Sequence, residues 1–325
     1  MSGALILGCA GPVLDAGEAA FFRDADPWGF ILFRRNVAGI AELRALTDAL
    51  RNAVGWQAPV FVDQEGGTVQ RLRPPLARDW PDASAQPGGA AAVFLRHRLM
   101  AAELAACGID GNCAPVIDVA GPDTHPFLQR RIWSPDPSEV ATLARAAAEG
   151  LLAGGVLPVI KHLPGHGAAN ADTHHDLARC RLSRDALEAA DFVPVRALAD
   201  LPLGMTSHVV YDAIDPDRPA TLSPAVLRML REDLGFGGLL MTDDLSMNAL
   251  PGTLTERASG AIAAGCDVIL HCSGDLAEMQ AVAAASGPLT AVRRAERALA
   301  ARKPPAPIDI AAATAEFERL SNAGA

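Results

Sequence analysis

The stretch 161–175 is the part of the chain whose residue types and spacing are best suited to chemistry. It holds a lysine, an aspartate and four of the protein's eight histidines, interrupted by a proline and two glycines. Histidine transfers protons well near neutral pH because its unperturbed pKa is about 6.5. Asp172 and His174 are close enough along this stretch for the carboxylate to orient the imidazole and raise its basicity. The pattern predicts a general acid/base at His174 or His175.

A metal site is the alternative interpretation of the same stretch. His162 and His166 have the four-residue spacing of a helical zinc site. Pro164 lies between them and is unsuited to a helix interior, so the spacing favours a loop, although a loop can also supply ligands. A metal-dependent barrel hydrolase that combines these histidines with Asp243 and Asp244 is the rival from a different class of enzyme. We expect neither a metal nor a cofactor.

Two adjacent carboxylates, Asp243 and Asp244, follow the apolar run 239–242. Neighbouring residues of a strand point to opposite faces, so we expect only one of the two to reach a site at the strand end. That carboxylate could serve as a nucleophile, as a metal ligand or as a simple cap of the strand. Opposite a histidine–aspartate pair and two buried cations, a functional role is favoured.

The segment 63–71 is a third group of candidate residues. Its two consecutive glycines allow a tight turn, which would let Asp63 and Arg71 face the same site. Aspartate accepts hydrogen bonds from vicinal sugar hydroxyls, and arginine supplies a rigid fork of donors. The alternative is an aspartate–arginine pair that only fixes the loop. Arg130 and Arg131 form a fourth group, in which we expect one of the two to face solvent.

Eight short apolar runs alternate with helical stretches and must position these groups. The runs are 4–9, 29–33, 59–62, 112–116, 156–160, 204–208, 239–242 and 267–271, and the helical stretches include 41–54, 90–107, 138–153, 184–199, 223–234 and 256–264. Strands alternating with helices pair in parallel, and eight such units predict a (β/α)8 TIM-like barrel of the α/β class. A doubly wound open sheet is the alternative architecture.

Polar residues at the ends of six of these runs support the barrel. They are Asp63, Asp118, Lys161 with His162, His208, Asp243 and His271. In a barrel, the carboxyl ends of the strands converge on one mouth, where barrel enzymes place their chemistry. We expect a single domain over residues 1–325, with a catalytic core at about 3–300 and a C-terminal helix at about 308–321.

Composition excludes several classes of function. A net charge of −10 without a basic run argues against nucleic-acid binding, and no apolar stretch is long enough to span a membrane. The first residues lack the basic and apolar regions of a signal peptide, so we expect a cytoplasmic protein. The six cysteines form no C-x-x-C pair and are expected to be reduced core thiols. We expect a monomer or a weak oligomer.

Four segments together resemble the family 3 glycoside hydrolases, in their NagZ-type β-N-acetylglucosaminidase (β-hexosaminidase) branch. The segment Lys161-His-Leu-Pro-Gly-His-Gly-x-x-x-x-Asp172-Thr-His174 is similar to the K-H-F-P-G-H-G-x-x-x-x-D-S-H signature of that branch. Segments 29–36, 63–71 and 238–247 are similar to its early strand, its sugar-binding turn and the strand that carries its nucleophile.

The resemblance implies a role for each matching residue. Asp243 would be the nucleophile, His174 the general acid/base, and Asp172 the partner that orients the histidine. The residues that would hold the non-reducing N-acetylglucosamine are Asp63, Arg71, Arg131, Lys161 and His162. Met205 and His208 match the M-x-x-H strand of the branch. They would contact the reacting residues without taking part in the reaction themselves.

The implied reaction is that of a retaining exo-glycosidase with a covalent glycosyl-Asp243 intermediate. The implied substrate is N-acetylglucosamine β-linked to anhydro-N-acetylmuramic acid, with or without a stem peptide, in peptidoglycan recycling. A histidine in place of a second carboxylate would let phosphate approach the intermediate, so a phosphorylase on the same site is an alternative. An inactive sugar-binding barrel is disfavoured because Asp243, Asp172 and His174 are all present.

Overall fold

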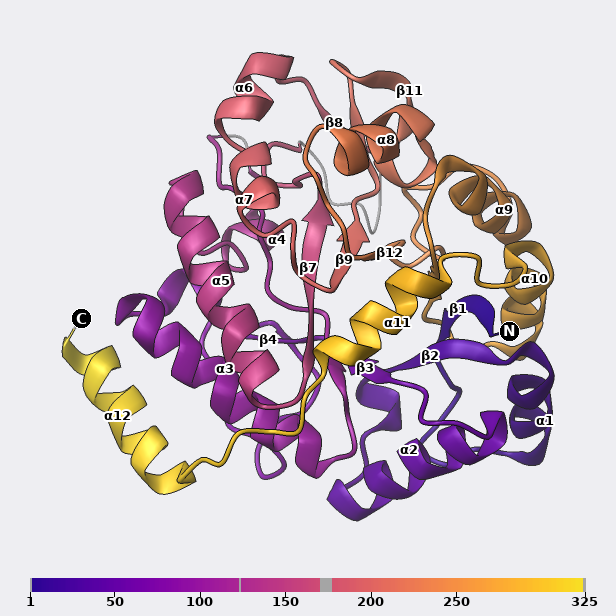
Figure 1. The fold of residues 1–325 in the computed structure, drawn as a ribbon, viewed down its shortest axis with the longest axis horizontal. Coiled ribbons are helices and arrows are strands. Elements are labelled where there is room, and N and C mark those ends of the chain that lie inside the picture. Colours follow the sequence, from indigo (N-terminus) through magenta and orange to yellow (C-terminus); the bar gives the residue numbers. More distant parts are fainter. Residues whose placement is uncertain (1, 123, 170–176, 324–325) are drawn as a thin grey trace.

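The computed structural model describes residues 2–122, 124–169 and 177–323, which are organised around a ring of eight parallel strands (Figure 1). The ring consists of β1 (Gly3–Leu7), β2 (Pro27–Leu32), β3 (Val60–Val62), β6 (Gly111–Asn112), β7 (Leu157–Leu163), β9 (Leu203–Thr206), β12 (Leu239–Met241) and β13 (Ile269–His271). The strands follow chain order, β13 pairs with β1, and a bridge between Met241 and Val268 narrows the remaining gap. The predicted barrel is confirmed. The doubly wound sheet is excluded, because its strand order would reverse at a switch point.

All eight predicted strands are present, with two informative differences in their bounds. The run 112–116 is a strand only at Gly111–Asn112, because Pro115 has no amide hydrogen with which to continue the ladder. Val116 pairs again as an isolated bridge to Lys161. Conversely, β7 continues to Leu163, so Lys161 and His162 lie inside the strand and not after it.

Helices cover the outside of the barrel (Figure 1). The helices are α1 (Ala16–Ala25), α2 (Ile40–Val54), α3 (Gly89–Ala106), α4 (Pro126–Gln129), α5 (Pro137–Ala153), α6 (Arg184–Ala189), α7 (Phe192–Ala197), α8 (Pro224–Glu232), α9 (Leu254–Ala264), α10 (Leu276–Ser286), α11 (Val292–Ala301) and α12 (Ile310–Ala323), with short 3-10 turns at Arg34–Asn36, Ala83–Ala85 and Ala220–Leu222. Ser223 caps α8, and its hydroxyl accepts a hydrogen bond from the Val226 amide at 3.1 Å.

The single helix predicted over 184–199 is wrong. The chain forms α6 and α7 instead, and Ala190 between them has φ −123° and ψ −88°, outside the helical region. Pro194 explains the break, because a proline has no amide hydrogen to donate to the carbonyl four residues earlier and its ring collides with that carbonyl. The helical pattern was correct, but the proline divides it.

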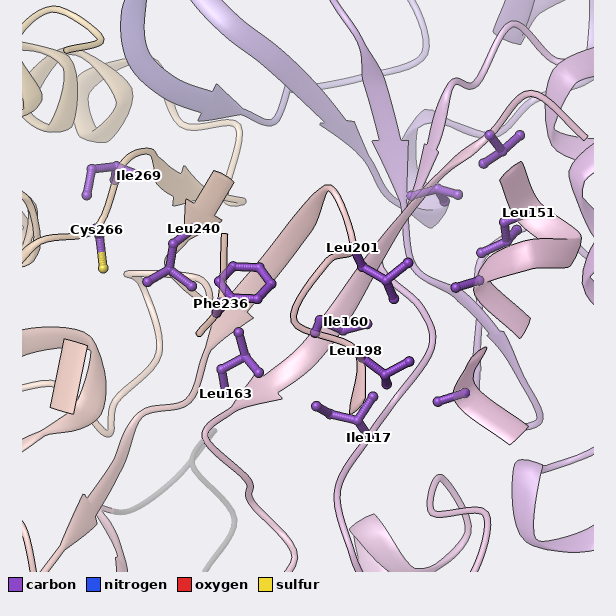
Figure 2. Close-up of a cluster of buried hydrophobic side chains, with 14 of the residues drawn as sticks. Ile117, Leu151, Ile160, Leu163, Leu198, Leu201, Phe236, Leu240, Cys266 and Ile269 are labelled. Atoms are coloured by element: carbon purple, nitrogen blue, oxygen red, sulfur yellow. The ribbon is translucent and has the colours of Figure 1, made fainter. Parts of the chain in front are cut away.

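Alternate residues of the strands enter two separate apolar cores. On β7, Leu157 and Val159 pack inside the barrel, whereas Ile160 and Leu163 pack between the barrel and the helices. Figure 2 shows part of the outer core, with Ile117, Leu151, Ile160, Leu163, Leu198, Leu201, Phe236, Leu240, Cys266 and Ile269 labelled. This alternation determines which residues beyond the strand ends face the barrel axis.

The two last helices have different positions. Ala295 and Ala298 of α11 join the inner core beside residues that begin several barrel strands, so α11 closes the amino end of the barrel. α12 lies beyond an extended connector and packs on α3 (Figure 1). It occupies the region predicted for the C-terminal helix, and its Phe317 stacks edge-to-face on Trp80 at 5.5 Å.

Two smaller sheets complete the described structure. β4 (Gln64–Gly66) and β5 (Val69–Gln70) form a hairpin, and β8 (Ala178–Cys180), β10 (Val209–Tyr211) and β11 (Asp215–Pro219) form a three-stranded sheet. All six cysteines are free and buried, as predicted for core thiols. Every helix in the described ranges is too short or too polar to cross a membrane.

Candidate active site

Strand alternation brings three charged side chains to the inside of the barrel at its carboxyl end. Asp63, Lys161 and Asp243 each follow, by two residues, an inward-facing apolar residue of β3, β7 or β12. Those apolar residues are Phe61, Val159 and Met241, all of them in the inner core. The three charged side chains line a cavity of about 200 Å³ at the mouth of the barrel.

The cavity collects most of the residues proposed from the sequence. Its lining includes Asp63, Arg71, Arg131, Lys161, His162 and Asp243. A smaller adjoining cavity of about 110 Å³ shares Asp63, Arg71 and Asp243 and is also lined by Met205. Asp172 and His174, like His175, lie outside the described residues.

One side of the cavity is a network of paired charges. Lys161 Nζ lies 2.9 Å from Asp63 Oδ1 and 2.6 Å from Glu65 Oε1. Arg131 forms a bidentate pair with Glu65, at 2.9 and 3.0 Å, and Arg71 Nη2 lies 2.9 Å from Asp63 Oδ2. Each carboxylate in this network therefore contacts two cations.

The pairing determines the protonation states of these groups. Burial opposes ionisation of Asp63 and Glu65, but their cationic partners outweigh it and hold both carboxyl pKa values below their usual range. Burial likewise opposes the charge of Lys161, yet the two carboxylates raise its pKa above the usual value. Asp63, Glu65 and Lys161 are thus ionised at neutral pH.

The β4–β5 hairpin positions Arg71 and Glu65. Gln64 anchors it, because its side-chain oxygen accepts hydrogen bonds from the amides of Arg71 and Leu72, at 2.9 and 3.0 Å. The Gln64 amide in turn donates to Asn112 Oδ1 of β6 at 2.9 Å. The turn predicted at the two glycines is the loop of this hairpin, and it turns Arg71 back toward Asp63.

Lys161 and His162 are adjacent in sequence, yet both side chains reach the cavity. The pairing of β7 with β9 shifts register between Lys161 and Leu163, which re-aims one of two neighbouring side chains. His162 Nδ1 bonds Asp118 Oδ2 at 2.8 Å, and Asp118 Oδ1 accepts from the amides of His162 and His166, at 3.2 and 2.8 Å. Asp118 therefore fixes the imidazole so that Nε2 faces the cavity.

Asp243 lies on the other side of the cavity from the charge network. Its Oδ1 accepts a hydrogen bond from the Asp244 amide at 2.8 Å, and its Oδ2 lies 4.0 Å from His162 Nε2. Burial opposes ionisation, but the neighbouring His162 and His208, the hydrogen bond from the Asp244 amide and Lys161 together outweigh it and hold the pKa of Asp243 below its usual range. The site thus contains an ionised carboxylate facing the cavity.

Asp244 makes different hydrogen bonds from its neighbour Asp243. Its Oδ1 accepts from the amides of Cys272 and Ser246, at 3.1 and 3.2 Å, and its Oδ2 accepts from the Ser246 hydroxyl. These contacts fix the loop after β12. Asp243 lines both cavities, whereas Asp244 lines only the smaller one and bonds the loop with both of its oxygens.

His208 lies behind Asp243 and contacts the backbone of the same loop. Its Nε2 lies 3.0 Å from the Asp244 carbonyl oxygen, and its Nδ1 lies 2.8 Å from the Thr221 hydroxyl. Burial lowers the pKa of His208, so the imidazole is neutral and can donate one hydrogen bond and accept the other.

The metal alternative combines His162 and His166 with Asp243 and Asp244. The rings of His162 and His166 lie 5.5 Å apart, and Asp244 is occupied by the loop. Burial, followed by the charge of His162, lowers the pKa of His166 to about 4. Within the described ranges, no cluster of three or more potential ligands has a metal-binding arrangement.

Sequence reasoning missed two residues of the site. It assigned no role to Glu65, and it treated Asp118 only as a polar strand end. Glu65 belongs to the segment 63–71. It is a charged residue between a predicted strand and a pair of glycines, and this position is the signal that could have identified it. Its partner Arg131 is 66 residues away, a pairing that spacing alone does not predict.

Fold and site together define a (β/α)8-barrel enzyme with a charged pocket at the carboxyl ends of its strands. A model of the glycosyl hydrolase family 3 N-terminal domain matches residues 21–298. The chain therefore belongs to glycosyl hydrolase family 3, as the sequence motifs predict.

Known relatives agree with this assignment. The chain is 41% identical to a β-hexosaminidase of Alkalilimnicola ehrlichii over 288 residues, which cover 83% of this chain and 81% of that protein. A crystal structure of NagZ from Neisseria gonorrhoeae with a zinc ion superimposes with a TM-score of 0.83 at 29% identity, covering 99% of this chain and 97% of the other. NagZ from the same organism in complex with N-trifluoroacetyl-D-glucosamine gives a TM-score of 0.80 at 30% identity, covering 98% of each chain. The predicted NagZ-type β-N-acetylglucosaminidase branch is confirmed.

Proposed function

We propose that this chain is a retaining exo-β-N-acetylglucosaminidase in which Asp243 is the nucleophile. The observation that carries the proposal is the position of the Asp243 carboxylate, which faces the same cavity as the paired charges of Asp63, Lys161 and Arg71. A retaining glycosidase needs an ionised carboxylate that faces its bound sugar, and Asp243 is in that position relative to the paired charges.

The charge network is suited to binding the sugar. A hydroxyl group both donates and accepts a hydrogen bond, so it can bridge a carboxylate and a cation without leaving either charge unsatisfied. Asp63 can accept from vicinal hydroxyls, while Lys161, Arg71 and Arg131 supply donors. His162 presents Nε2 between this network and Asp243.

The reaction proceeds in two displacements. Ionised Asp243 attacks the anomeric carbon, the bond from that carbon to the leaving oxygen breaks, and protonated His174 gives its proton to that oxygen. Neutral His174, oriented by Asp172, then removes a proton from water, which attacks the same carbon and releases Asp243. The roles of His174 and Asp172 rest on the family resemblance, since both lie outside the described residues.

The finer substrate also rests on the family. The N-acylated glucosamine bound by the gonococcal protein supports an N-acetylglucosamine subsite in this cavity. Family membership supports a leaving group of anhydro-N-acetylmuramic acid, with or without a stem peptide. We propose a role in peptidoglycan recycling in the cytoplasm on the same basis.

The direct test is hydrolysis of 4-nitrophenyl β-N-acetylglucosaminide by the intact chain, followed by proton NMR of the first sugar formed. A retaining enzyme releases the β-anomer first; initial release of the α-anomer would contradict the two-displacement mechanism. Repeating the assay across a phosphate titration separates hydrolysis from phosphorolysis. Formation of N-acetylglucosamine 1-phosphate with a rising rate would assign the phosphorylase alternative.

A further inference from the structure

Outside the cavity, Arg96 of α3 is a buried cation that donates its side-chain hydrogen bonds to uncharged groups. Its side chain is fully buried, with 0% of the residue exposed. Nη2 donates to the carbonyl oxygens of Glu65 and Pro81, both at 2.7 Å, and Nη1 donates to Gln86 Oε1 at 3.0 Å. All three acceptors are uncharged groups.

The stability of the fold does not account for this arginine. Burial lowers the pKa of Arg96 to about 9, against the opposing charges of Asp82 and Glu65, and Nε has no hydrogen-bond partner among the described residues. A buried cation without a bonded carboxylate pays a desolvation cost that an apolar side chain of similar volume would avoid. The reason for an arginine at this position must therefore lie in what its donors hold.

The donors of Arg96 hold the main chain of Glu65. The side chain of Glu65 is the carboxylate that contacts both Arg131 and Lys161 at the cavity wall. The next residue, Gly66, has φ +110°, and a Cβ atom there would collide with Arg96 Nη2. The guanidinium thus occupies the space that any other side chain at residue 66 would need, and arginine and glycine are a matched pair.

Aromatic rings fix the plane of the guanidinium. Its central carbon lies 5.9 Å from the Trp80 ring and 5.6 Å from the Trp133 ring. Trp133 Nε1 donates to the Val116 carbonyl at 3.1 Å, and Trp80 Nε1 donates to Glu103 Oε2 at 3.0 Å. With both rings anchored, the direction of the Arg96 donors is set before any ligand arrives.

We propose that Arg96 is a positioning residue for the sugar site, acting from outside the barrel through the backbone of Glu65. By fixing that backbone, Arg96 keeps the Glu65 carboxylate where Arg131 and Lys161 both reach it. The consequence for activity rests on the proposed function of this cavity. Because Asp243 lies on the opposite side, loss of Arg96 weakens sugar binding more than it slows the chemical step.

Arg98 provides a matched control on the same helix. It is also buried, at 5% exposure, and its Nη2 donates to the carbonyl oxygen of Ala306 in the connector before α12. It makes no described contact with Glu65. Replacing Arg98 removes a buried guanidinium and its hydrogen bond to Ala306 without touching the cavity wall.

The experiment compares Arg96→Met, Arg96→Lys and Arg98→Met in steady-state kinetics on 4-nitrophenyl β-N-acetylglucosaminide and in crystal structures. We expect Arg96→Met to raise KM about tenfold with kcat changed less than about threefold, the loss expected of a charge-assisted hydrogen bond. Arg96→Lys, which can reach fewer of the three acceptors, should fall between Arg96→Met and wild type. Arg98→Met should keep KM within about twofold of wild type while lowering the melting temperature.

Equal KM values for Arg96→Met and Arg98→Met at matched folded fraction would overturn the proposal. The crystal structures test the same claim without any assay. In Arg96→Met the bidentate Glu65–Arg131 pair should be broken, and an unchanged pair would overturn the positioning role. If the wild-type chain does not hydrolyse the glycoside, the proposed function fails, and the crystal structures alone decide the positioning claim.

Discussion

The two sides of the cavity use charge in opposite ways. On the side of β3 and β7, Asp63 and Glu65 each contact two cations at 2.6–3.0 Å. On the side of β12, Asp243 accepts one described hydrogen bond, from the Asp244 amide, and its second oxygen lies 4.0 Å from His162 Nε2. The side of β3 and β7, with its paired charges, is arranged to bind a sugar. The side of β12 keeps an ionised carboxylate oxygen available to react.

The contrast has a physical basis. A carboxylate held by two cations is fixed in orientation and has part of its lone-pair capacity occupied, which makes it a poor nucleophile but leaves well-oriented acceptor positions for hydroxyls. Buried pairs of this kind contribute little net stability, because desolvation offsets their attraction. Their arrangement is therefore better explained by the need for oriented donors and acceptors than by stability of the barrel.

The largest expected effect comes from removing the carboxylate on the reacting side. Asp243→Asn should lower kcat by about four orders of magnitude or more with little change in KM, because the covalent step is lost. Asp244→Asn, its neighbour, should cost far less, through disturbance of the loop held by Cys272 and Ser246. An Asp244 variant as inactive as the Asp243 variant would remove the distinction between the two.

The next effect tests the paired side. Glu65→Gln leaves Arg131 and Lys161 with one carboxylate fewer, so kcat/KM should fall about a hundredfold, mostly through KM, and the protein should lose about 3 kcal/mol of unfolding free energy. Asp267→Asn is the control, because Asp267 also holds two arginines, Arg231 and Arg294, but away from the cavity. It should lose stability with unchanged KM. A normal KM in Glu65→Gln would contradict a binding role for the network.

A smaller effect tests how His162 is aimed between the two sides. Asp118→Asn removes the carboxylate that bonds His162 Nδ1, so kcat/KM should fall about tenfold. The bond lies behind the imidazole and not in the cavity, so the variant should still bind N-acetylglucosamine, measured by calorimetry. Wild-type kinetics in Asp118→Asn would show that the orientation of His162 does not matter.

The smallest effect on activity is expected from Asp191, which lies away from both sides of the cavity. Its effect is on how the stability of the fold depends on pH. Asp191 is buried beside Gly165, and burial, followed by the charge of Asp118, raises the pKa of Asp191 to about 7. The raised pKa of Asp191 adds to the free energy of unfolding. This contribution is fully present below the pKa of the unfolded chain, about 3.9, and is lost as pH rises through 7. In urea unfolding, wild type should therefore lose about 1–4 kcal/mol relative to Asp191→Asn between pH 4 and pH 7.5. If the free energy of unfolding changed with pH in the same way in both proteins, the raised pKa of Asp191 would be contradicted.

Much of the barrel could be predicted from the chain. Short apolar runs of the right spacing identified all eight strands, and period-two alternation explains why Asp63, Lys161 and Asp243 face one axis. The register shift that lets His162 accompany Lys161 was not predictable, because it depends on pairing with β9, about forty residues later. The Glu65–Arg131 pair was not predictable either, because its two residues lie 66 positions apart in the sequence. The break of 184–199 follows from Pro194, which interrupts an otherwise helical pattern.

The most direct test of the central claim is to trap the covalent intermediate. Incubation with an activated 5-fluoro derivative of N-acetylglucosamine slows the second displacement more than the first, so the glycosyl-enzyme accumulates and can be mapped by peptide mass spectrometry. We expect one sugar per chain, attached to Asp243 and absent in Asp243→Asn. A sugar on another carboxylate, or turnover of a β-glycoside with no adduct at Asp243, would contradict it.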